Sequence, residues 1–429
     1  MNLHETHSIL ALISLAVFVL AYLIVASEEY THIRKSKPVI LASGIIWFSV
    51  AYLAIYHHGY SKIEVQELIK SNLTDYGELL LFLLVSMTYT NALVERNVFE
   101  KIRYTLSLWG LSYRKIFWLT GLIAFFMSAI ANNLTTAMVM GAVVLACAKG
   151  NSKFIQLSFI NIVVAANAGG VFSPFGDVTT LMMWQSGKIE FFGFFDLLLP
   201  AMINFFVPAA LLSFFIPSLT PVSDIEEPVE LKKGAFIISI LFFATIAIAV
   251  VSEQVLYIPP FMGMMMGLVL LMILSIWLKK TGQDDADYDV FVNIKDAEWD
   301  TLFFFYGVIF CIGGLAVLGY LEWASLAIYS NLSPTSANVF IGVLSAVVDN
   351  IPVMFAVLEM QPPMDMTQWL LVTLTSGVGG SLLAIGSAAG VALMGQSKGH
   401  YSFIGHLKWS PLIALGYGAS IYIHLLIQS

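Results

Sequence analysis

The chain has 429 residues, of which 59% are hydrophobic and 11% are charged, and its formal net charge is −8. A soluble protein carries about 25% charged residues, so this composition excludes a water-soluble domain. No Lys or Arg occurs between Lys295 and Lys398, a run typical of polytopic membrane proteins, whose helices each need roughly 20 apolar residues. Cys147 and Cys311 lie far apart in apolar segments, which excludes a disulfide framework and a cysteine metal site.

The apolar segments predict an all-α polytopic membrane protein with 10–11 transmembrane helices. The N-terminus lacks a basic region, so the first segment is expected to be a retained helix rather than a signal peptide. Two segments, near 154–187 and 367–396, are interrupted by glycine or proline and predict broken helices. Two others, 115–149 and 321–360, have polar centres and predict re-entrant hairpins, and 96–114 counts as one partial span. Uninterrupted spans are expected near 8–27, 38–57, 78–94, 195–217, 234–252, 258–278, 301–320 and 409–427.

The basic residues predict how these helices are oriented, because Lys and Arg concentrate on the inner side of a membrane. If residues 1–7 are outside, 17 of the 20 Lys and Arg residues fall in inside loops. Lys62, Lys70 and Lys188 then fall outside. This topology requires the first hairpin to enter from the inside and the second from the outside. The inside loops are 28–37, 94–115, 149–153, 218–233, 279–300 and 397–408.

The segment 161–184 is an apolar helix that is interrupted in its middle. Pro174 removes a backbone donor, and the glycines around it raise the entropic cost of remaining helical. Unpaired backbone inside a bilayer is tolerated only where protein covers it or where it lines a cavity. A carboxylate at such a break, here Asp177, lies among carbonyl and hydroxyl oxygens and predicts a site for a hard cation.

Two motifs recur in the same order along the chain. The tip at 131–135, ANNLT, has a counterpart 217 positions later at 348–352, VDNIP. The break at 169–177 aligns without a gap to 379–387, at an offset of 210 positions. Together with the opposite orientations of the two hairpins, this predicts an inverted repeat with discontinuous helices, as in many secondary transporters.

The tips NNLTT and DNIP, with NAGGVFSPFGDVTT after the first tip, resemble the NhaD-type sodium/proton antiporters of the ion transporter superfamily. The similarity extends over about residues 78–396. It implies exchange of Na⁺ or Li⁺ for protons across a bacterial inner membrane, by an elevator-like movement within a homodimer. The expected domains are N-terminal scaffold helices at 1–77, a first repeat at 78–218, cytoplasmic linkers and scaffold helices (234–278) at 219–300, and a second-repeat core at 301–429.

The resemblance also implies which residues bind ions and protons. They are Asn132, Asn133, Asn167, Ser173, Asp177, Thr179, Thr180, Asp349, Asn350 and Ser387, with Glu78 as an outlying candidate. The Na⁺ ligands among them would be Asn133, Asp177, Thr180, Asp349 and Asn350.

One position departs from the family pattern. The family usually has Asp where this chain has Asn132. Asn keeps an oxygen ligand but cannot ionise or carry a proton. A natural change would point to a different stoichiometry or ion preference, and an engineered change would point to an impaired or trapped protein.

The residues themselves support exchange chemistry. A low-dielectric site disfavours the charged form of a carboxylate, so that a proton competes with Na⁺ for it. Asp177 and Asp349 have no Lys or Arg in their own segments, so no ion pair is expected unless a distant helix supplies one. The alternative for Asp177 is a purely structural role as a helix N-cap. The histidines, including His400 and His406, are expected in loops or at interfaces.

The predicted function is therefore that of a cation/proton antiporter, and not of an enzyme. The alternative is a sodium-coupled carboxylate or other anion symporter of the same superfamily. The expected partners are Na⁺ or Li⁺, protons, the lipid bilayer and a second copy of the chain, without a nucleic acid or a cofactor. The expected location is the inner membrane, with multiple passes and the N-terminus outside.

Overall fold

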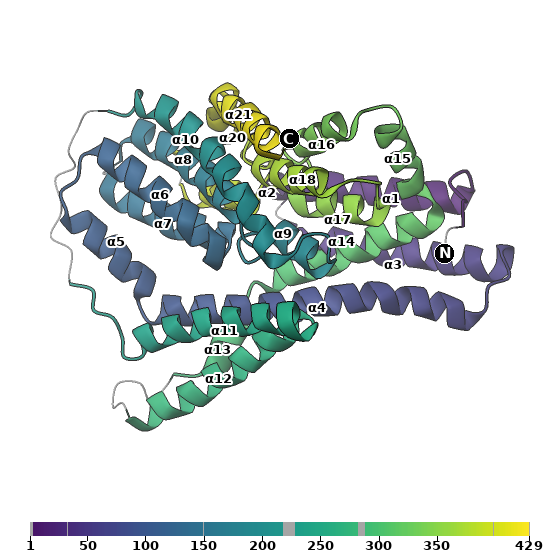
Figure 1. Ribbon diagram of the computed structural model, residues 1–429, viewed down its shortest axis with the longest axis horizontal. Helices are drawn as coiled ribbons and strands as arrows, with labels where there is room; N and C mark the ends of the chain where they lie inside the picture. The colour runs from purple at the N-terminus through teal and green to yellow at the C-terminus, as the bar shows by residue number, and fades with distance from the viewer. Residues whose placement is uncertain are drawn as a thin grey trace.

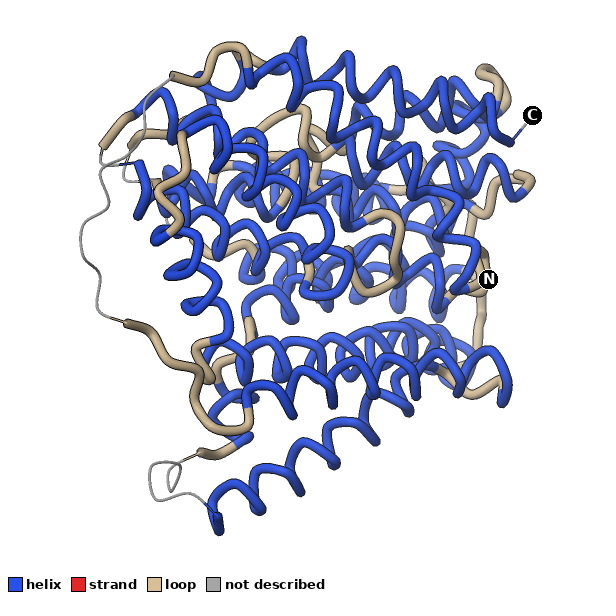
Figure 2. Tube along the Cα trace, turned by 60° about the vertical axis from the view of Figure 1, so that its left-hand side comes forward, coloured by secondary structure: helices blue, strands red, loops and turns tan. Residues whose placement is uncertain are grey.

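The computed structural model describes residues 3–31, 33–148, 150–217, 228–281, 288–397 and 399–428. Within these ranges the chain consists of helices and loops and contains no strand (Figures 1 and 2). Eight helices among the described residues are long and apolar enough to cross a membrane. The predicted all-α membrane fold is confirmed. Parts of the expected cytoplasmic linkers, 218–227 and 282–287, lie outside the described residues.

The first group of helices packs along the 34-residue helix α4 (Lys62–Glu95) and around the pair formed by α3 (Ser36–Tyr52) and α14 (Trp299–Leu318). The hydroxyl of Ser61 accepts a hydrogen bond from the backbone N–H of Glu64, and the Glu64 carboxylate accepts one from the Ser61 N–H, so a capping box begins α4. In Figure 1, α4 runs along the lower part of the molecule with α11 and α12 beside it. The group also contains α1 (Ile9–Ala26), α2 (Glu28–Thr31), α3 (Ser36–Tyr52) with a π-helical turn (Leu53–His57), α11 (Ala235–Leu256), α12 (Pro260–Thr281), α13 (Val290–Lys295) and α14 (Trp299–Leu318).

The second group surrounds α8 (Ser152–Gly170), whose residues 157–170 are all buried. Because this part of α8 is buried on every side, α8 is the core of this group. In Figure 1 its neighbours α6, α7 and α10 gather beside it. The other members are α5 (Val98–Leu108), α6 (Tyr113–Ala131), α7 (Asn133–Ala148), α9 (Val178–Gln185), a 3₁₀ helix (Phe191–Leu197), α10 (Leu198–Ser213), α15 (Tyr320–Tyr329), α16 (Pro334–Leu344), α17 (Asn350–Met360), α18 (Met366–Gly379), α19 (Ala388–Gln396), α20 (Phe403–Leu407) and α21 (Ser410–Gln428).

Several boundaries differ from the prediction. The expected domain boundary between residues 77 and 78 falls inside α4. Residues 96–114 contain the 11-residue α5 and the first two residues of α6, and α5 is too short to cross a bilayer core of about 30 Å, which agrees with the expected partial span. The segment 321–360 was expected to form one hairpin with two arms. It contains the pair α16 and α17 and, before them, a third helix, α15. The first arm of the other hairpin, α6, is long enough to cross a membrane by itself, so a re-entrant path remains a prediction.

Helices α6 and α8 approach so closely that only glycine fits at their contact. A β-carbon at Gly169 would overlap the carbonyl oxygen of Phe125. The contact recurs in the second half of the chain, where a β-carbon at Gly379 would overlap the carbonyl oxygen of Gly342. Phe125 and Gly342 are separated by the 217-position offset of the hairpin tips. The glycines therefore hold each interrupted helix against its neighbouring hairpin.

Replacing Gly169 by Ala is expected to destabilise the protein by about 1–3 kcal/mol, because the added methyl group overpacks the contact of α6 with α8. Cys147 and Cys311 are buried, so their reaction with a thiol-reactive dye during heating reports unfolding. Gly395→Ala is the matched control, since a β-carbon on this helical glycine meets no atom within 4 Å. A melting temperature that is equally unaffected in both variants would contradict the packing argument.

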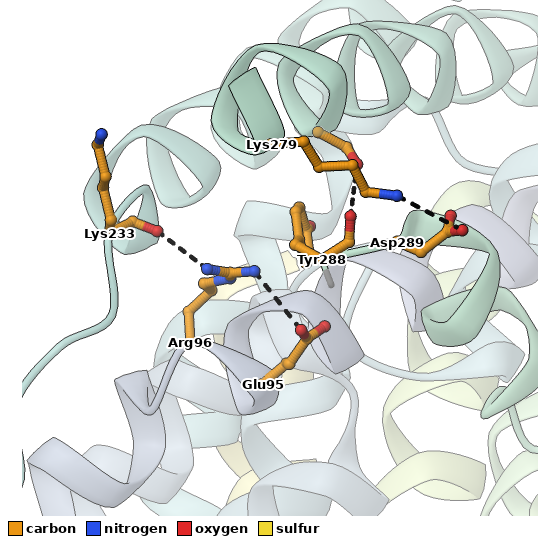
Figure 3. Close-up of polar contacts among 7 residues, drawn as sticks. Glu95, Arg96, Lys233, Lys279, Tyr288 and Asp289 are labelled. Carbon is orange, nitrogen blue, oxygen red and sulfur yellow. Dashed lines mark hydrogen bonds and ion pairs between the residues drawn. The ribbon is translucent and has the colours of Figure 1, made fainter. Parts of the chain in front are cut away.

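The first group is joined at one end by a buried arginine at the C-cap of α4 (Figure 3). Arg96 is 1% exposed. Its guanidinium lies 3.8 Å from the Tyr288 ring, donates to the Lys233 carbonyl at 3.2 Å and lies 3.5 Å from the Glu95 carboxylate. Nearby, Lys279 at the end of α12 lies 3.7 Å from Asp289. These contacts connect the end of α4 to the start of α11 and to the segment before α13.

Candidate functional site

The first interrupted helix breaks between α8 and α9, and polar side chains of the break itself form hydrogen bonds with its non-helical backbone. Asp177 has an extended backbone and caps α9 by accepting from the Thr179 N–H at 3.4 Å. The hydroxyl of Thr180 donates to the carbonyls of Asp177 at 2.7 Å and Ser173 at 2.8 Å. The hydroxyl of Ser173 accepts from the Phe175 N–H. Thr180 and Ser173 therefore stabilise the backbone of the break. The second carboxylate oxygen of Asp177 has its partner outside the break.

The second interrupted helix breaks between α18 and α19 with the same geometry. Ser387 caps α19 with φ −145° and ψ 151°, and Asp177 caps α9 with φ −142° and ψ 151°. The Ser387 hydroxyl accepts from the Gly390 N–H. The residues that the sequence alignment pairs therefore occupy equivalent backbone positions, one carrying a carboxylate and the other a hydroxyl.

Each break accepts a hydrogen bond from an amide of the other half of the chain. Asn350, the first residue of α17, donates to the second carboxylate oxygen of Asp177 at 2.8 Å. Asn167 on α8 donates to the Ser387 hydroxyl at 3.0 Å. Asp177 is 5% exposed, and the other three side chains are 3% exposed or less. Each half of the chain thus contributes one helix cap and one amide to a buried polar centre.

Two oxygen atoms near this centre lack a hydrogen-bond partner among the described residues. They are the Asn167 carbonyl oxygen and the Thr179 hydroxyl oxygen, and both residues are fully buried. Desolvated oxygens of this kind are ligands for a hard cation. Asn350 presents its NH₂ group to Asp177, so its amide must rotate before its oxygen can bind a cation. No group of three or more His, Cys, Asp or Glu side chains positioned for a metal occurs in the described part of the chain.

The two hairpin tips differ. Asn132 has φ 57° and ψ 160°, a strained conformation for a residue other than glycine, and its side-chain oxygen caps α7 by accepting from the Thr135 N–H at 2.9 Å. Asn133 follows it as the buried first residue of α7. Asp349 occupies the N-cap position of α17, but its side chain makes no capping hydrogen bond, so its carboxylate is available to residues of other helices.

An ion pair was expected only if a distant helix supplied the base, and the structure shows such a pair for Asp349. The ammonium group of Lys35 lies 3.9 Å from its carboxylate. Lys35 directly precedes α3 and lies 314 positions before Asp349 in the sequence. The residues around Asp349 therefore could not predict this ion pair. Asp177 makes no ion pair with any residue that the structure describes.

Glu78 lies apart from this centre. It lines a cavity of about 260 Å³ together with Asp75, Lys188 and Glu359, and neither Asp177 nor Asp349 belongs to the lining. The structure therefore brings together Asp177, Asn350, Asn167 and Ser387 but leaves Glu78 in a separate acidic cavity.

His406 is not at the surface, as the sequence had suggested, but fully buried. One ring nitrogen lies 2.6 Å from the Tyr401 hydroxyl and the other 2.9 Å from the carbonyl oxygen of Ser381, in the second break. Burial lowers the pKa of His406 to about 4, so its ring is neutral near pH 7. His406 therefore supports the backbone of the break. Its flanking residues in the sequence gave no signal of this, because short polar loops commonly lie at a surface.

The sequence is similar to known transport proteins over most of its length. The family model described as "Citrate transporter" matches residues 7–379. The Na(+)/H(+) antiporter NhaD of Vibrio cholerae is 50% identical, over 99% of this chain and 93% of its own length. The protein of the same name from Alkalimonas amylolytica is 49% identical, over 98% of this chain and 91% of its own. Sodium/proton antiporter 1 of Arabidopsis thaliana is 30% identical, over 83% and 62%.

Proposed function

Since this chain belongs to the NhaD-type family of sodium/proton antiporters, we propose that it exchanges Na⁺ for protons at Asp177. The chain is a secondary transporter rather than an enzyme. The observation that supports Asp177 is its environment: a buried carboxylate between two interrupted helices, with an amide partner and no ion pair within the described residues.

The chemistry follows from the cost of burying charge. An unpaired carboxylate is costly in a low-dielectric interior unless a proton or a cation neutralises it. A proton on Asp177 and a Na⁺ beside it exclude each other, so binding of one ion releases the other. Na⁺ must replace part of its hydration shell with protein oxygens, and Asn167 and Thr179 offer buried oxygens for this purpose.

The remaining site residues take supporting roles in the proposal. Asn350 binds Asp177 and Ser387 accepts from Asn167, which links the two halves of the chain, while Ser173 and Thr180 bind the backbone of the first break. In the proposal, the tip residues Asn132 and Asn133 offer further amide oxygens from the first hairpin. Asp349 adds a second carboxylate at the other tip.

The family resemblance extends the proposal to the setting of the protein. Li⁺ is a second substrate, because it carries the same charge and also binds oxygen ligands. Exchange proceeds by an elevator-like movement of the second group of helices against the first, in a homodimer. The protein crosses the bacterial inner membrane with its N-terminus outside, as the distribution of Lys and Arg favours.

The description of the matching family favours a second function, transport of a carboxylate with Na⁺. A citrate-like anion would require a positive pocket beside the breaks. Lys35 is the basic residue near the tips, and its ammonium group already faces Asp349. The anionic Asp177 would repel such a substrate, so we place cation exchange first.

Everted membrane vesicles test the proposal. Adding Na⁺ or Li⁺ to acidified vesicles is expected to dequench a pH-sensitive dye within seconds, because protons leave as the cation enters. Vesicles from cells that lack the protein provide the baseline. Uptake of labelled dicarboxylate without proton movement would instead establish the symporter.

A further inference from the structure

Lys35 is held at Asp349 by contacts from two directions. Its ammonium group lies 3.9 Å from the Asp349 carboxylate and 4.6 Å from the centre of the Phe304 ring on α14. Each side chain of the ion pair is 18% exposed, so water screens the pair only partly. The charge of Lys35 also acts on the carboxylates of Glu298 and Glu28, and Glu28 faces the backbone N–H of Lys35 as well. In the described structure, neither carboxylate comes within 4.0 Å of the Lys35 ammonium group. The neighbouring Ser36 donates to the carboxylate of Asp300.

The charges around the two breaks are therefore unequal. The first hairpin tip carries Asn132, which has no charge, and the second carries Asp349 paired with Lys35. Asp177 is the remaining carboxylate, and its side-chain partner is the amide of Asn350. The first break and the second hairpin tip together thus carry the two carboxylates of Asp177 and Asp349 and the ammonium group of Lys35, and these three groups have one net negative charge to be neutralised.

We propose that Lys35 is a positioning residue that serves as the permanent counter-charge of Asp349, so that each transport cycle exchanges one Na⁺ for one proton without net movement of charge. The inference rests on the proposed function. Na⁺ binds the Asp177 carboxylate as the proton on that carboxylate leaves, and the Asp349–Lys35 pair stays neutral throughout. Without Lys35, Asp349 would take up a proton together with Asp177 and release it when one Na⁺ binds, so that two protons would move against one Na⁺ and the cycle would move one net charge.

Purified protein in liposomes, with the membrane voltage clamped by K⁺ and valinomycin, tests this inference. The measurement is the balance point, which is the proton gradient at which a given Na⁺ gradient causes no net proton flux. For the wild type we expect the two gradients to be equal at balance and independent of voltage. For Lys35→Met we expect the balance point to depend on voltage and the proton gradient at zero voltage to be the square root of the Na⁺ gradient, as for two protons per Na⁺.

Three further variants separate charge from structure. Lys35→Arg keeps the positive charge and is expected to keep the wild-type balance point. The double variant Lys35→Met/Asp349→Asn removes both charges and is expected to restore it. Lys37→Met, at an exposed lysine two residues away, is the matched control. The balance point is a ratio of gradients, so a lower amount of folded protein does not change it.

The possible failures are distinguishable. Absence of any Na⁺- or Li⁺-driven proton flux in the wild type would refute the proposed function itself. Voltage-dependent exchange in the wild type, or an unchanged balance point in Lys35→Met, would overturn the role of Lys35 while leaving cation exchange intact.

Discussion

Vesicles that contain the Asp177→Asn variant are expected to show no more Na⁺-driven proton movement than vesicles without the protein. Asn has nearly the same shape and can still accept from the Thr179 N–H, so the cap of α9 should be retained. It cannot ionise, and the site therefore loses the one group at which a proton and Na⁺ exclude each other. Dye dequenching on addition of Na⁺ or Li⁺ measures the effect.

Asp196→Asn is the matched control for this variant, since Asp196 is an exposed aspartate in the 3₁₀ helix between α9 and α10. It is expected to retain wild-type exchange. Both variants should elute as the wild type does in size-exclusion chromatography, which excludes misfolding as the cause. Substantial exchange by a folded Asp177→Asn protein would contradict this prediction. It would show that protons and Na⁺ exchange at another carboxylate, for which Asp349 is the first candidate.

Arg96→Ala is expected to lower the free energy of unfolding by about 3 kcal/mol. Figure 3 shows why: the guanidinium lies between the Lys233 carbonyl and the Glu95 carboxylate and faces the Tyr288 ring. Removing it leaves the carbonyl without this donor and creates a cavity beside Tyr288, whose side chain is buried. Heating in detergent, with the reaction of the buried cysteines as the readout, measures the loss.

Arg103→Ala provides the comparison. Arg103 pairs with Glu100 one turn away on the short helix α5, at 2.7 Å, and Glu100 is half exposed. Surface pairs of this kind contribute about 0.3–0.5 kcal/mol, so its melting temperature is expected to stay close to that of the wild type. Equal shifts for the two variants would show that Arg96 does not hold α4 and α11 together.

The sequence alone was sufficient to predict the helical membrane fold and the position of the first break. The reason is that membrane helices and their interruptions depend on local properties: apolar length, and the effects of Pro174 and the neighbouring glycines on the backbone. The gapless alignment of the two breaks also anticipated the matching conformations of Asp177 and Ser387, because a cap is determined by the residues next to it.

Only the tertiary structure decided which polar groups meet. The hydrogen bonds of Asn350 with Asp177 and of Asn167 with Ser387 join residues 173 and 220 positions apart, and no local pattern predicts such a pairing. The same holds for Lys35, which reaches Asp349 from before α3, and for the burial of His406. The sequence determines which residues can carry a charge, but the counter-charge of such a residue and its access to water depend on how distant helices pack.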